Sequence, residues 1–303
     1  MITEKLNFET LGYKSLNRSV IKKTNYLVLM ILNSFLSNCK LAYKHARAAL
    51  LMLSFSDVKI IGVSTMPPFE IIVVPALSDN YIYIAHDSSN KTTLVVDPSE
   101  AKPVVDVLNA RGWTITHILN THHHGDHIGG NQELLEKYNP ILIGPLSEES
   151  RIPNMHQMIK EGDTIDIGGH EGLVFETPGH TNGHIAVWFE DSDALFCGDT
   201  LFALGCGRVF EGTMEEMWTS LKKLRSLPSS TKIFCGHEYT LSNAKFAQSI
   251  DPQNEALQQQ IKKFESMRAD GIPTIPTLLK DELNTNPFPV SYTHLTLPTK
   301  RIV

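Results

Sequence analysis

The chain has 303 residues, of which 42% are hydrophobic and 20% are charged. This length and composition are typical of an enzyme with one large domain and a smaller appendage. The formal net charge of -6 argues against a nucleic-acid partner, because affinity for phosphates needs clustered Lys and Arg. A small anionic substrate needs only a local basic patch and stays compatible with this charge.

The cysteines indicate a reducing environment. They include no Cys-x-x-Cys pair and no dense spacing, whereas a disulfide framework needs closely spaced, paired cysteines. We therefore predict a cytoplasmic location. The four cysteines are Cys39, Cys197, Cys206 and Cys235.

Residues 1–65 differ in composition from the rest of the chain. They carry nine Lys and Arg against three acids, whereas the remainder is acidic. Their most apolar piece, residues 26–36, is about half as long as the roughly 20 residues of a membrane-spanning helix, so we predict no membrane span. We interpret the segment as a disordered or artefactual extension, because Met66 directly precedes the first convincing strand. A mitochondrial transit peptide is the alternative, since such peptides are basic and poor in acids.

Strands and one helix are predicted between residues 69 and 119. Two runs rich in β-branched and aromatic residues, 69–77 and 81–85, bracket a Ser-Asp-Asn turn and predict a hairpin. Apolar residues at helical spacing predict a helix over 101–111, which Gly112 ends. Strands are predicted before and after this helix, over 92–96 and 114–119.

The remaining chain continues this mixed pattern and then becomes helical. Helices are predicted over 130–138 and 214–227, and everything from residue 241 onward reads as helical. The order predicts a layered α/β domain over residues 66–237, followed by a helical domain over 238–288. The strands of the first domain after residue 138 are predicted over 141–143, 164–167, 173–177, 184–189, 194–197 and 232–235.

A histidine-rich segment follows the strand that is predicted to end at residue 119. Four of the thirteen histidines lie in Thr-His-His-His-Gly-Asp-His at residues 121–127. Alternate side chains of extended backbone share a face, so His122 and His124 point the same way and His123 points away. Imidazole together with carboxylate suits Zn, Fe or Mn in a site that keeps open coordination positions. We therefore predict that metal is bound by His122, His124, Asp126 and His127.

Three further metal-ligand candidates lie at the ends of predicted strands. Each directly follows a Gly, which lets the backbone turn tightly and present the side chain at a sheet edge. The candidates in 121–127 alone are too many for one ion with an open position, so the full set divides into two sites that share one carboxylate. The further candidates are His180 in Thr-Pro-Gly-His-Thr, Asp199 in Cys-Gly-Asp-Thr and His237 in Cys-Gly-His-Glu.

This series of motifs resembles the metallo-β-lactamase superfamily, which has His-x-His-x-Asp-His followed by His, Asp and His at strand ends. The resemblance implies an α/β fold, an αββα sandwich with a helical C-terminal domain. It also implies two divalent metal ions per chain, expected to be Zn, with Fe or Mn as alternatives. In this pattern the first metal is held by His122, His124 and His180, the second by Asp126, His127 and His237, and Asp199 bridges them.

Further segments are similar to glyoxalase II (hydroxyacylglutathione hydrolase) over roughly residues 68–288. They include Val-Pro-Ala-Leu-Ser-Asp-Asn-Tyr at 74–81, Gly-Cys-Gly-Arg-Val-Phe-Glu-Gly at 205–212 and Cys-Gly-His-Glu-Tyr-Thr at 235–240. The resemblance implies hydrolysis of the thioester S-D-lactoylglutathione to glutathione and D-lactate, as in methylglyoxal detoxification. A hydroxide that bridges the two metals would attack the thioester, with Asp126 and Asp199 as catalytic residues.

Contacts with the glutathione part of the substrate are implied at Arg208, Phe210 and Tyr239. Arg208 keeps the charge of the family's basic residue, whereas Phe210 lacks the hydroxyl of the Tyr that the family often has there. Basic residues that follow the Asn-Pro-Phe segment add contacts in the family, but here the segment at 286–288 is followed by Pro-Val-Ser-Tyr. The tail 289–303 does not resemble the family, and we expect it to be foreign sequence that weakens substrate affinity.

Composition and resemblance together predict a monomer that acts on a small glutathione thioester and binds neither nucleic acid nor a membrane. Other hydrolases of this fold act on lactones, β-lactams or RNA, and a related single-iron enzyme oxidises glutathione persulfide. From a different class, a non-catalytic metal- or glutathione-binding module is the alternative. Metal content measured together with thioester hydrolysis would separate these alternatives.

Other residues near the motifs have structural interpretations. His123 and His184 are predicted to support the ligands or to pack against them. Cys197 and Cys235 are expected in the core, because they end strands that are predicted to be buried. The remaining histidines are expected on the surface or in loops, and they are His45, His86, His117, His156, His170 and His294.

Overall fold

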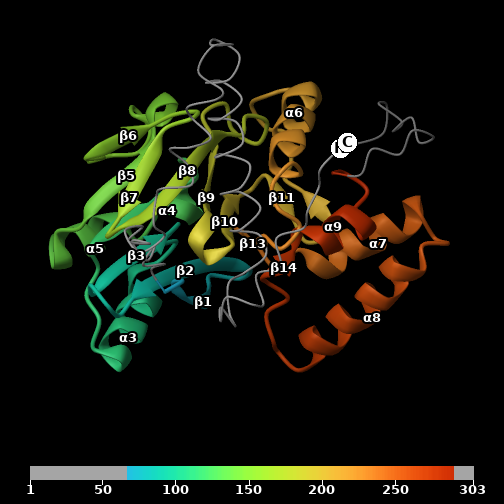
Figure 1. The fold of residues 1–303 in the computed structure, drawn as a ribbon, viewed down its shortest axis with the longest axis horizontal. Helices are drawn as coiled ribbons and strands as arrows, with labels where there is room; N and C mark the ends of the chain where they lie inside the picture. The colour runs from blue at the N-terminus through green and yellow to red at the C-terminus, as the bar shows by residue number, and fades with distance from the viewer. Residues whose placement is uncertain (1–66, 290–303) are drawn as a thin grey trace, which may run out of the picture. The chain divides into compact units, whose positions relative to one another are not determined.

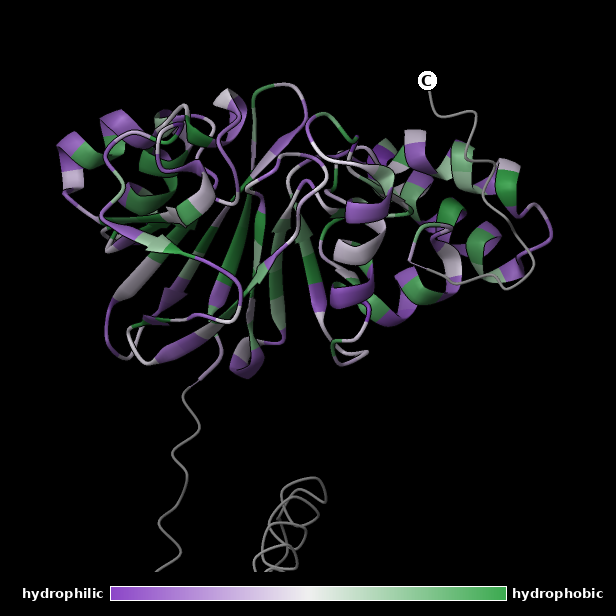
Figure 2. Cartoon of the chain, turned by 90° about the horizontal axis from the view of Figure 1, so that it is seen from above, coloured by the Kyte–Doolittle hydropathy of each residue, from purple (hydrophilic) through white to green (hydrophobic). Residues whose placement is uncertain are grey.

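The structure is a computed structural model that describes residues 67–289. The predictions for the basic N-terminal segment and for nearly all of the C-terminal tail lie outside these residues. The described part contains two six-stranded sheets and one two-stranded sheet, with helices on either side (Figures 1 and 2). No helix between residues 67 and 289 is long and apolar enough to cross a membrane.

The first sheet has the strand order β1-β2-β3-β4-β5-β6. Its first three strands are antiparallel, and each later strand runs parallel to the one before it. Helices α3 (Ala101–Arg111) and α5 (Asn131–Tyr138) pack against its outer face. The strands are β1 (Glu70–Ala76), β2 (Asn80–Asp87), β3 (Thr92–Val96), β4 (His117–Leu119), β5 (Ile141–Pro145) and β6 (Gln157–Ile159).

The second sheet has the order β14-β13-β10-β9-β8-β7. Helix α6 (Met214–Leu224) packs against it and starts with a capping box between Thr213 and Glu216. A separate hairpin, β11 (Leu201–Phe202) with β12 (Gly205–Cys206), follows β10 in the chain. The six strands are β7 (Thr164–Ile167), β8 (His170–Glu176), β9 (Ile185–Phe189), β10 (Ala194–Gly198), β13 (Lys232–Cys235) and β14 (Thr277–Leu278).

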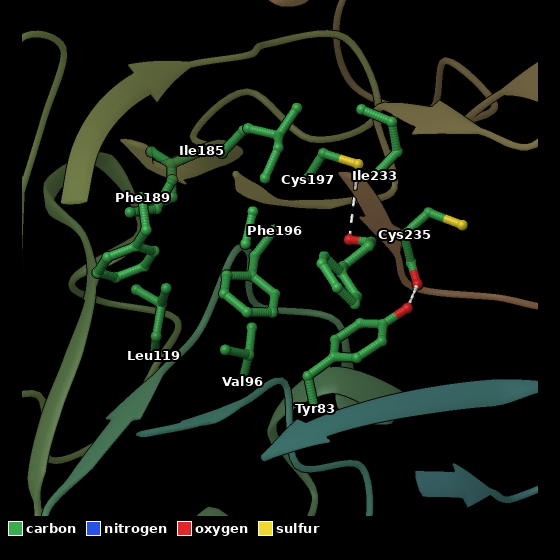
Figure 3. Packing of buried hydrophobic residues seen from close by; sticks show 14 of the residues in the cluster. Tyr83, Val96, Leu119, Ile185, Phe189, Phe196, Cys197, Ile233 and Cys235 are labelled. Atoms are coloured by element: carbon green, nitrogen blue, oxygen red, sulfur yellow. Dashed lines mark hydrogen bonds between the residues drawn. The ribbon is translucent and has the colours of Figure 1, made fainter. Parts of the chain in front are cut away.

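The two sheets pack face to face across an apolar core. Tyr83 and Val96 of the first sheet face Phe196 of the second, and the rings of Tyr83 and Phe196 lie 5.6 Å apart (Figure 3). The hydroxyl of Tyr83 donates a hydrogen bond to the carbonyl of Cys235, so its polar atom is satisfied inside the core. Cys197 and Cys235 are both buried in this core, as predicted. With helices outside both sheets, the predicted αββα sandwich is confirmed (Figure 2).

The C-terminal region contains three helices, but it also contains a short strand, which was not predicted. Thr277–Leu278 forms β14, which pairs antiparallel with β13 at the edge of the second sheet. A two-residue strand is too short to show alternation, so only its pairing reveals it. The helices are α7 (Thr240–Ile250), α8 (Glu255–Ala269) and α9 (Leu279–Thr285).

Two histidines that were expected on the surface or in loops are buried in strands. His86 lies in β2, is 5% exposed, and stacks its ring on Trp113 with centroids 3.9 Å apart. His170 lies in β8, is 0% exposed, and contacts the carboxylates of Asp87 and Asp191. The prediction was wrong because a buried imidazole needs partners that lie far away in the chain, and local pattern does not show them.

Candidate metal centre

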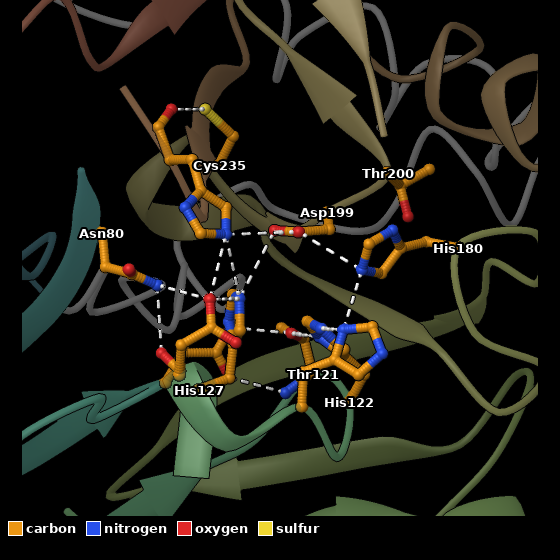
Figure 4. Close-up of polar contacts among 12 residues, drawn as sticks. Asn80, Thr121, His122, His127, His180, Asp199, Thr200 and Cys235 are labelled. Carbon is orange, nitrogen blue, oxygen red and sulfur yellow. Dashed lines mark hydrogen bonds and ion pairs between the residues drawn. The ribbon is translucent and has the colours of Figure 1, made fainter. Parts of the chain in front are cut away.

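Seven His and Asp side chains converge beyond the carboxyl ends of four strands (Figure 4). The histidine-rich segment follows β4 and enters the short helix α4 (Gly125–Ile128). His180, Asp199 and His237 follow β8, β10 and β13 of the second sheet. The sandwich therefore brings together residues that are more than one hundred positions apart in the chain.

The first group consists of three histidines. Nδ1 of His124 lies 3.1 Å from Nε2 of His122 and 3.0 Å from Nε2 of His180. His122 is fully buried and His180 nearly so, whereas His124 is partly exposed. Three ring nitrogens directed at one point form a donor set that suits a divalent cation.

The second group combines two histidines with a carboxylate. Nε2 of His127 and Nε2 of His237 lie 3.3 Å apart. Oδ2 of Asp126 lies 3.4 Å from Nε2 of His237 and 3.7 Å from Nε2 of His127. The side chain of Asp126 is 40% exposed, so this group is open to solvent on the Asp126 side.

Asp199 lies between the two groups. Its Oδ2 is 3.3 Å from Nε2 of His180 and 3.3 Å from Nε2 of His237, so a single oxygen faces both. Its Oδ1 is buried and accepts no hydrogen bond within residues 67–289. Oδ1 lies 3.5 Å from Nε2 of His127, so both oxygens of this buried carboxylate face ring nitrogens, an arrangement that fits bound cations.

The protonation tendencies of the two groups differ. Burial lowers the pKa of His122, His124 and His180, and nearby histidines lower it further at His122 and His124. Burial would also lower the pKa of His127, but the carboxylates of Asp199 and Asp97 outweigh it and raise this pKa to about 9. The all-histidine group is thus held as neutral imidazole, the form that binds metal.

Residues outside the two groups orient them, and none of these residues was predicted from the sequence. Nδ1 of His237 bonds to Oδ1 of Asp79 at 2.9 Å, and Nδ1 of His127 bonds to Oδ2 of Asp97 at 3.0 Å. Each carboxylate leaves the Nε2 of its histidine free to face the centre. The only available signal was position, because Asp79 lies in the turn before β2 and Asp97 directly after β3.

His123 and His184 lie outside both groups, as predicted. His123 turns away and bonds through Nδ1 to the carboxylate of Glu148. His184 accepts the backbone N–H of Asp199 at 3.0 Å and stacks on the ring of His122. Both therefore support neighbouring residues.

Two glycines are required because side chains approach them closely. A Cβ on Gly198, whose φ is +44°, would lie 2.3 Å from Oγ1 of Thr121. A Cβ on Gly236 would lie 2.3 Å from Oδ1 of Asp199. Gly236 has no positive φ, so its role is close approach and only Gly198 also supplies the unusual backbone conformation.

Comparisons with known proteins agree with this architecture. The family model of the metallo-beta-lactamase superfamily matches residues 75–237, and the model described as hydroxyacylglutathione hydrolase C-terminus matches residues 238–290. The hydroxyacylglutathione hydrolase of Methylococcus capsulatus is 50% identical over 219 residues, which cover 72% of this chain and 86% of that protein. The chain belongs to the hydroxyacylglutathione hydrolase family.

A second relative supports the same family, and a solved structure has a similar fold. The hydroxyacylglutathione hydrolase of Rhodospirillum rubrum is 51% identical over 223 residues, covering 74% of this chain and 87% of that protein. The crystal structure of ETHE1 from Myxococcus xanthus matches with a TM-score of 0.56 at 24% identity, covering 72% of this chain and 83% of that one. The likeness to ETHE1 concerns the fold alone. Family membership and the grouped His and Asp side chains together indicate a binuclear metal site.

The three positions implied to contact substrate in hydroxyacylglutathione hydrolases all lie beside this centre. The carbonyl of Arg208 accepts a hydrogen bond from Nδ1 of His180 at 2.8 Å, and its side chain is exposed. Phe210 is 62% exposed, with its ring centroid 5.2 Å from that of His180. Tyr239 stacks parallel on His237 at 4.7 Å. The three positions therefore adjoin His180 and His237 of the centre.

Proposed function

We propose that this chain hydrolyses the thioester of S-D-lactoylglutathione to glutathione and D-lactate, using two divalent metal ions that are expected to be Zn. The observation that carries the proposal is the position of Asp199 between the two groups of ligand candidates, in a chain 50% identical to a hydroxyacylglutathione hydrolase. The proposed ligands are His122, His124 and His180 for the first ion, Asp126, His127 and His237 for the second, and Asp199 for both.

The bound metals and residues of the chain would each contribute to hydrolysis of the thioester. When bound, a pair of divalent ions lowers the pKa of water from 15.7 to about 7 and polarises a carbonyl oxygen. Asp126 is held by Asn80, whose side-chain amide donates to Oδ2 of Asp126 at 3.0 Å. Because Asp126 is also partly exposed, it can orient an attacking oxygen toward the thioester carbon. Glutathione leaves as a thiolate, and an ordinary thiol pKa of about 8.5 means that no strong general acid is needed.

The residues beside the centre supply complementary binding groups. Burial and the nearby charge of Asp79 raise the pKa of Tyr239 to about 12, so its hydroxyl stays protonated near neutral pH and can donate a hydrogen bond. The exposed guanidinium of Arg208 can pair with a carboxylate of glutathione. Phe210 offers an exposed apolar ring directly above His180.

We also propose that the chain acts as a monomer on this small substrate, without nucleic acid or a membrane as partner. All the proposed ligands and substrate contacts come from one chain, which supports a site that is complete without a second copy. The cytoplasmic location stays a prediction.

Metal content and thioester hydrolysis test the proposal together. We expect elemental analysis to find two divalent ions per chain and the thioester absorbance of S-D-lactoylglutathione to fall when the enzyme is added. His124→Ala should lose bound metal and activity, whereas the control His117→Gln, in a strand away from the centre, should keep both. A chain that holds two metals and leaves the thioester intact would disprove the proposed function.

A further inference from the structure

The loop of residues 208–212 carries two of the proposed substrate contacts and lies against the segment that holds His180. Two hydrogen bonds to the backbone of the loop join them: the ring Nδ1 of His180 donates to the carbonyl of Arg208 at 2.8 Å, and the N–H of Gly212 donates to the carbonyl of Gly179 at 3.1 Å. Both contacts lie at the ends of the loop. Phe210, in its middle, is 62% exposed, and Val209 beside it is only partly buried against the core.

Glu211 supplies the side-chain anchor of this loop. Arg151 donates two parallel hydrogen bonds to its carboxylate, from Nη1 to Oε2 at 3.0 Å and from Nη2 to Oε1 at 2.6 Å. The backbone N–H of Asn182 donates to Oε2 at 2.9 Å. Arg151 lies beyond β5 and Asn182 follows His180, so Glu211 ties the loop to two segments far from it in the chain.

The same carboxylate lies next to the histidine-rich segment. Oε1 of Glu211 is 3.8 Å from Nε2 of His123, the histidine that turns away from the metal centre. His123 is held on its other side by Glu148, which also accepts a hydrogen bond from Oγ1 of Thr181 at 2.5 Å. The side chain of Glu211 is 22% exposed and that of Glu148 is 1% exposed, so Glu211 lies at the solvent edge of this network.

We propose that the Arg151–Glu211 ion pair is a positioning element that holds Arg208 and Phe210 in place for the glutathione part of the substrate. The inference rests on the proposed function for the identity of that substrate. Two parallel hydrogen bonds between a guanidinium and a carboxylate fix direction as well as distance. Without them the loop samples other positions, and substrate binding must include the cost of ordering it. The pair should therefore act on substrate binding, with little effect on the chemical step.

Three single variants test this in the metal-loaded full chain. Glu211→Gln and Arg151→Gln should each raise KM for S-D-lactoylglutathione by about five-fold, the range expected for a partly exposed ion pair, with kcat nearly unchanged and metal content unchanged. Arg151→Lys should raise KM less, because it keeps the charge but loses the two parallel bonds. The double variant Arg151→Gln with Glu211→Gln should be no worse than either single variant, because both remove the same interaction.

A matched control is Glu70→Gln. It breaks another partly exposed ion pair, between Glu70 at the start of β1 and Arg111 at the end of α3. Nη1 of Arg111 lies 2.8 Å from Oε1 of Glu70. We expect it to leave KM and kcat unchanged. An equal rise of KM in this control would show a general effect of lost surface charge and would overturn the inference.

Hydrogen exchange of the backbone amides in residues 208–212 supplies a readout that does not depend on activity. Exchange there should be faster in Glu211→Gln and Arg151→Gln than in the unchanged chain. Unchanged exchange would overturn the inference. A loss of metal with unchanged KM would also overturn it, because the pair would then act on the segment that holds His180 and not on the loop. If the unchanged chain does not hydrolyse the thioester, the proposed function fails, while exchange still decides whether the pair holds the loop.

Discussion

Two buried carboxyl groups adjoin the β11–β12 hairpin: Asp199 precedes it in the chain, and Glu282 accepts a hydrogen bond from Leu204 in its turn. The pKa of one is lowered from its ordinary value and that of the other is raised. Asp199, just before the hairpin, is 5% exposed. Burial opposes its ionisation, but the charges of His127 and His237 outweigh burial and hold its pKa well below the usual range. Glu282, on α9, is 0% exposed, and burial raises its pKa to about 7.

The difference comes from the partners, because both groups are removed from water. Asp199 faces imidazole rings, whereas Glu282 accepts hydrogen bonds from neutral donors, the N–H of Leu204 at 2.8 Å and the side-chain amide of Asn286 at 2.9 Å. Desolvation penalises the charged form in both places; the histidines near Asp199 outweigh it, whereas the hydrogen bonds to Glu282 do not. One carboxylate therefore faces the groups that could hold cations, and the other carboxyl links the C-terminal helices to the hairpin and keeps its proton to a higher pH than an exposed Glu.

Replacing each carboxyl by the amide of the same shape should separate the two roles, and the largest effect is expected at the metal centre. Asp199→Asn removes the charge that both ligand groups share. Metal affinity and thioesterase activity should fall together. The loss should exceed the roughly 10- to 100-fold that follows when a residue hydrogen-bonded to a metal ligand is changed. Elemental analysis and steady-state kinetics measure this, with Glu282→Gln as the matched control that keeps both metals. Full activity in Asp199→Asn would contradict a shared carboxylate.

The same change at Glu282 should instead stabilise the fold above neutral pH. The carboxyl titrates at 4.5 when exposed and at about 7 in the fold, so its contribution to stability is complete below pH 4.5 and is lost as pH rises to about 7. The difference between these two pKa values corresponds to roughly 3 kcal/mol of unfolding free energy. Gln is neutral at every pH, and its carbonyl can accept the two hydrogen bonds that Glu282 accepts now.

Urea unfolding at a series of pH values measures this effect. The unchanged chain and Glu282→Gln should have similar unfolding free energies at pH 4.5, and the variant should be the more stable one at pH 8. The pH dependence of the metal centre is common to both chains and cancels in the difference. Parallel curves for the two chains would show that Glu282 does not carry a proton in the fold.

A smaller effect on metal affinity is expected when a residue that only orients a proposed ligand is changed. Asp79→Asn removes the carboxylate that orients His237 through its Nδ1 at 2.9 Å. Affinity for one of the two metals should weaken about 10- to 100-fold, as measured by competition with a chelator. Asp106→Asn, which changes an exposed Asp paired with Lys102 on α3, is the control and should leave both affinities unchanged. Equal retention of both metals in Asp79→Asn would mean that other contacts orient His237.

Elements with strong local patterns could be predicted from the sequence. Strands β3, β7 and β13 and helix α3 have the predicted bounds. In β3 and β13 the apolar residues are continuous, and α3 ends at a glycine with φ of 68°. These patterns involve residues that are neighbours in the chain, so no knowledge of distant contacts is needed.

Short elements and buried polar groups could not be predicted in this way. Strands β11, β12 and β14 have two residues each, too few for alternation to be visible. Asp79 and Asp97 look like ordinary turn residues until the fold places them against His237 and His127. The burial of His170 likewise depends on Asp87, which lies 83 positions away.

The sequence by itself determined the order of the longer strands and helices, the resemblance to the family, and the set of His and Asp residues that follow strand ends. Local periodicity and turn chemistry act between near neighbours in the chain, so the sequence of those neighbours is enough to predict them. Only the tertiary structure decided which outer carboxylates orient His237 and His127, in which direction the pKa of each buried carboxyl group shifts, and that Arg151 reaches Glu211. Charge and hydrogen bonding act through space, so their outcome depends on which distant segments the packed sheets bring together.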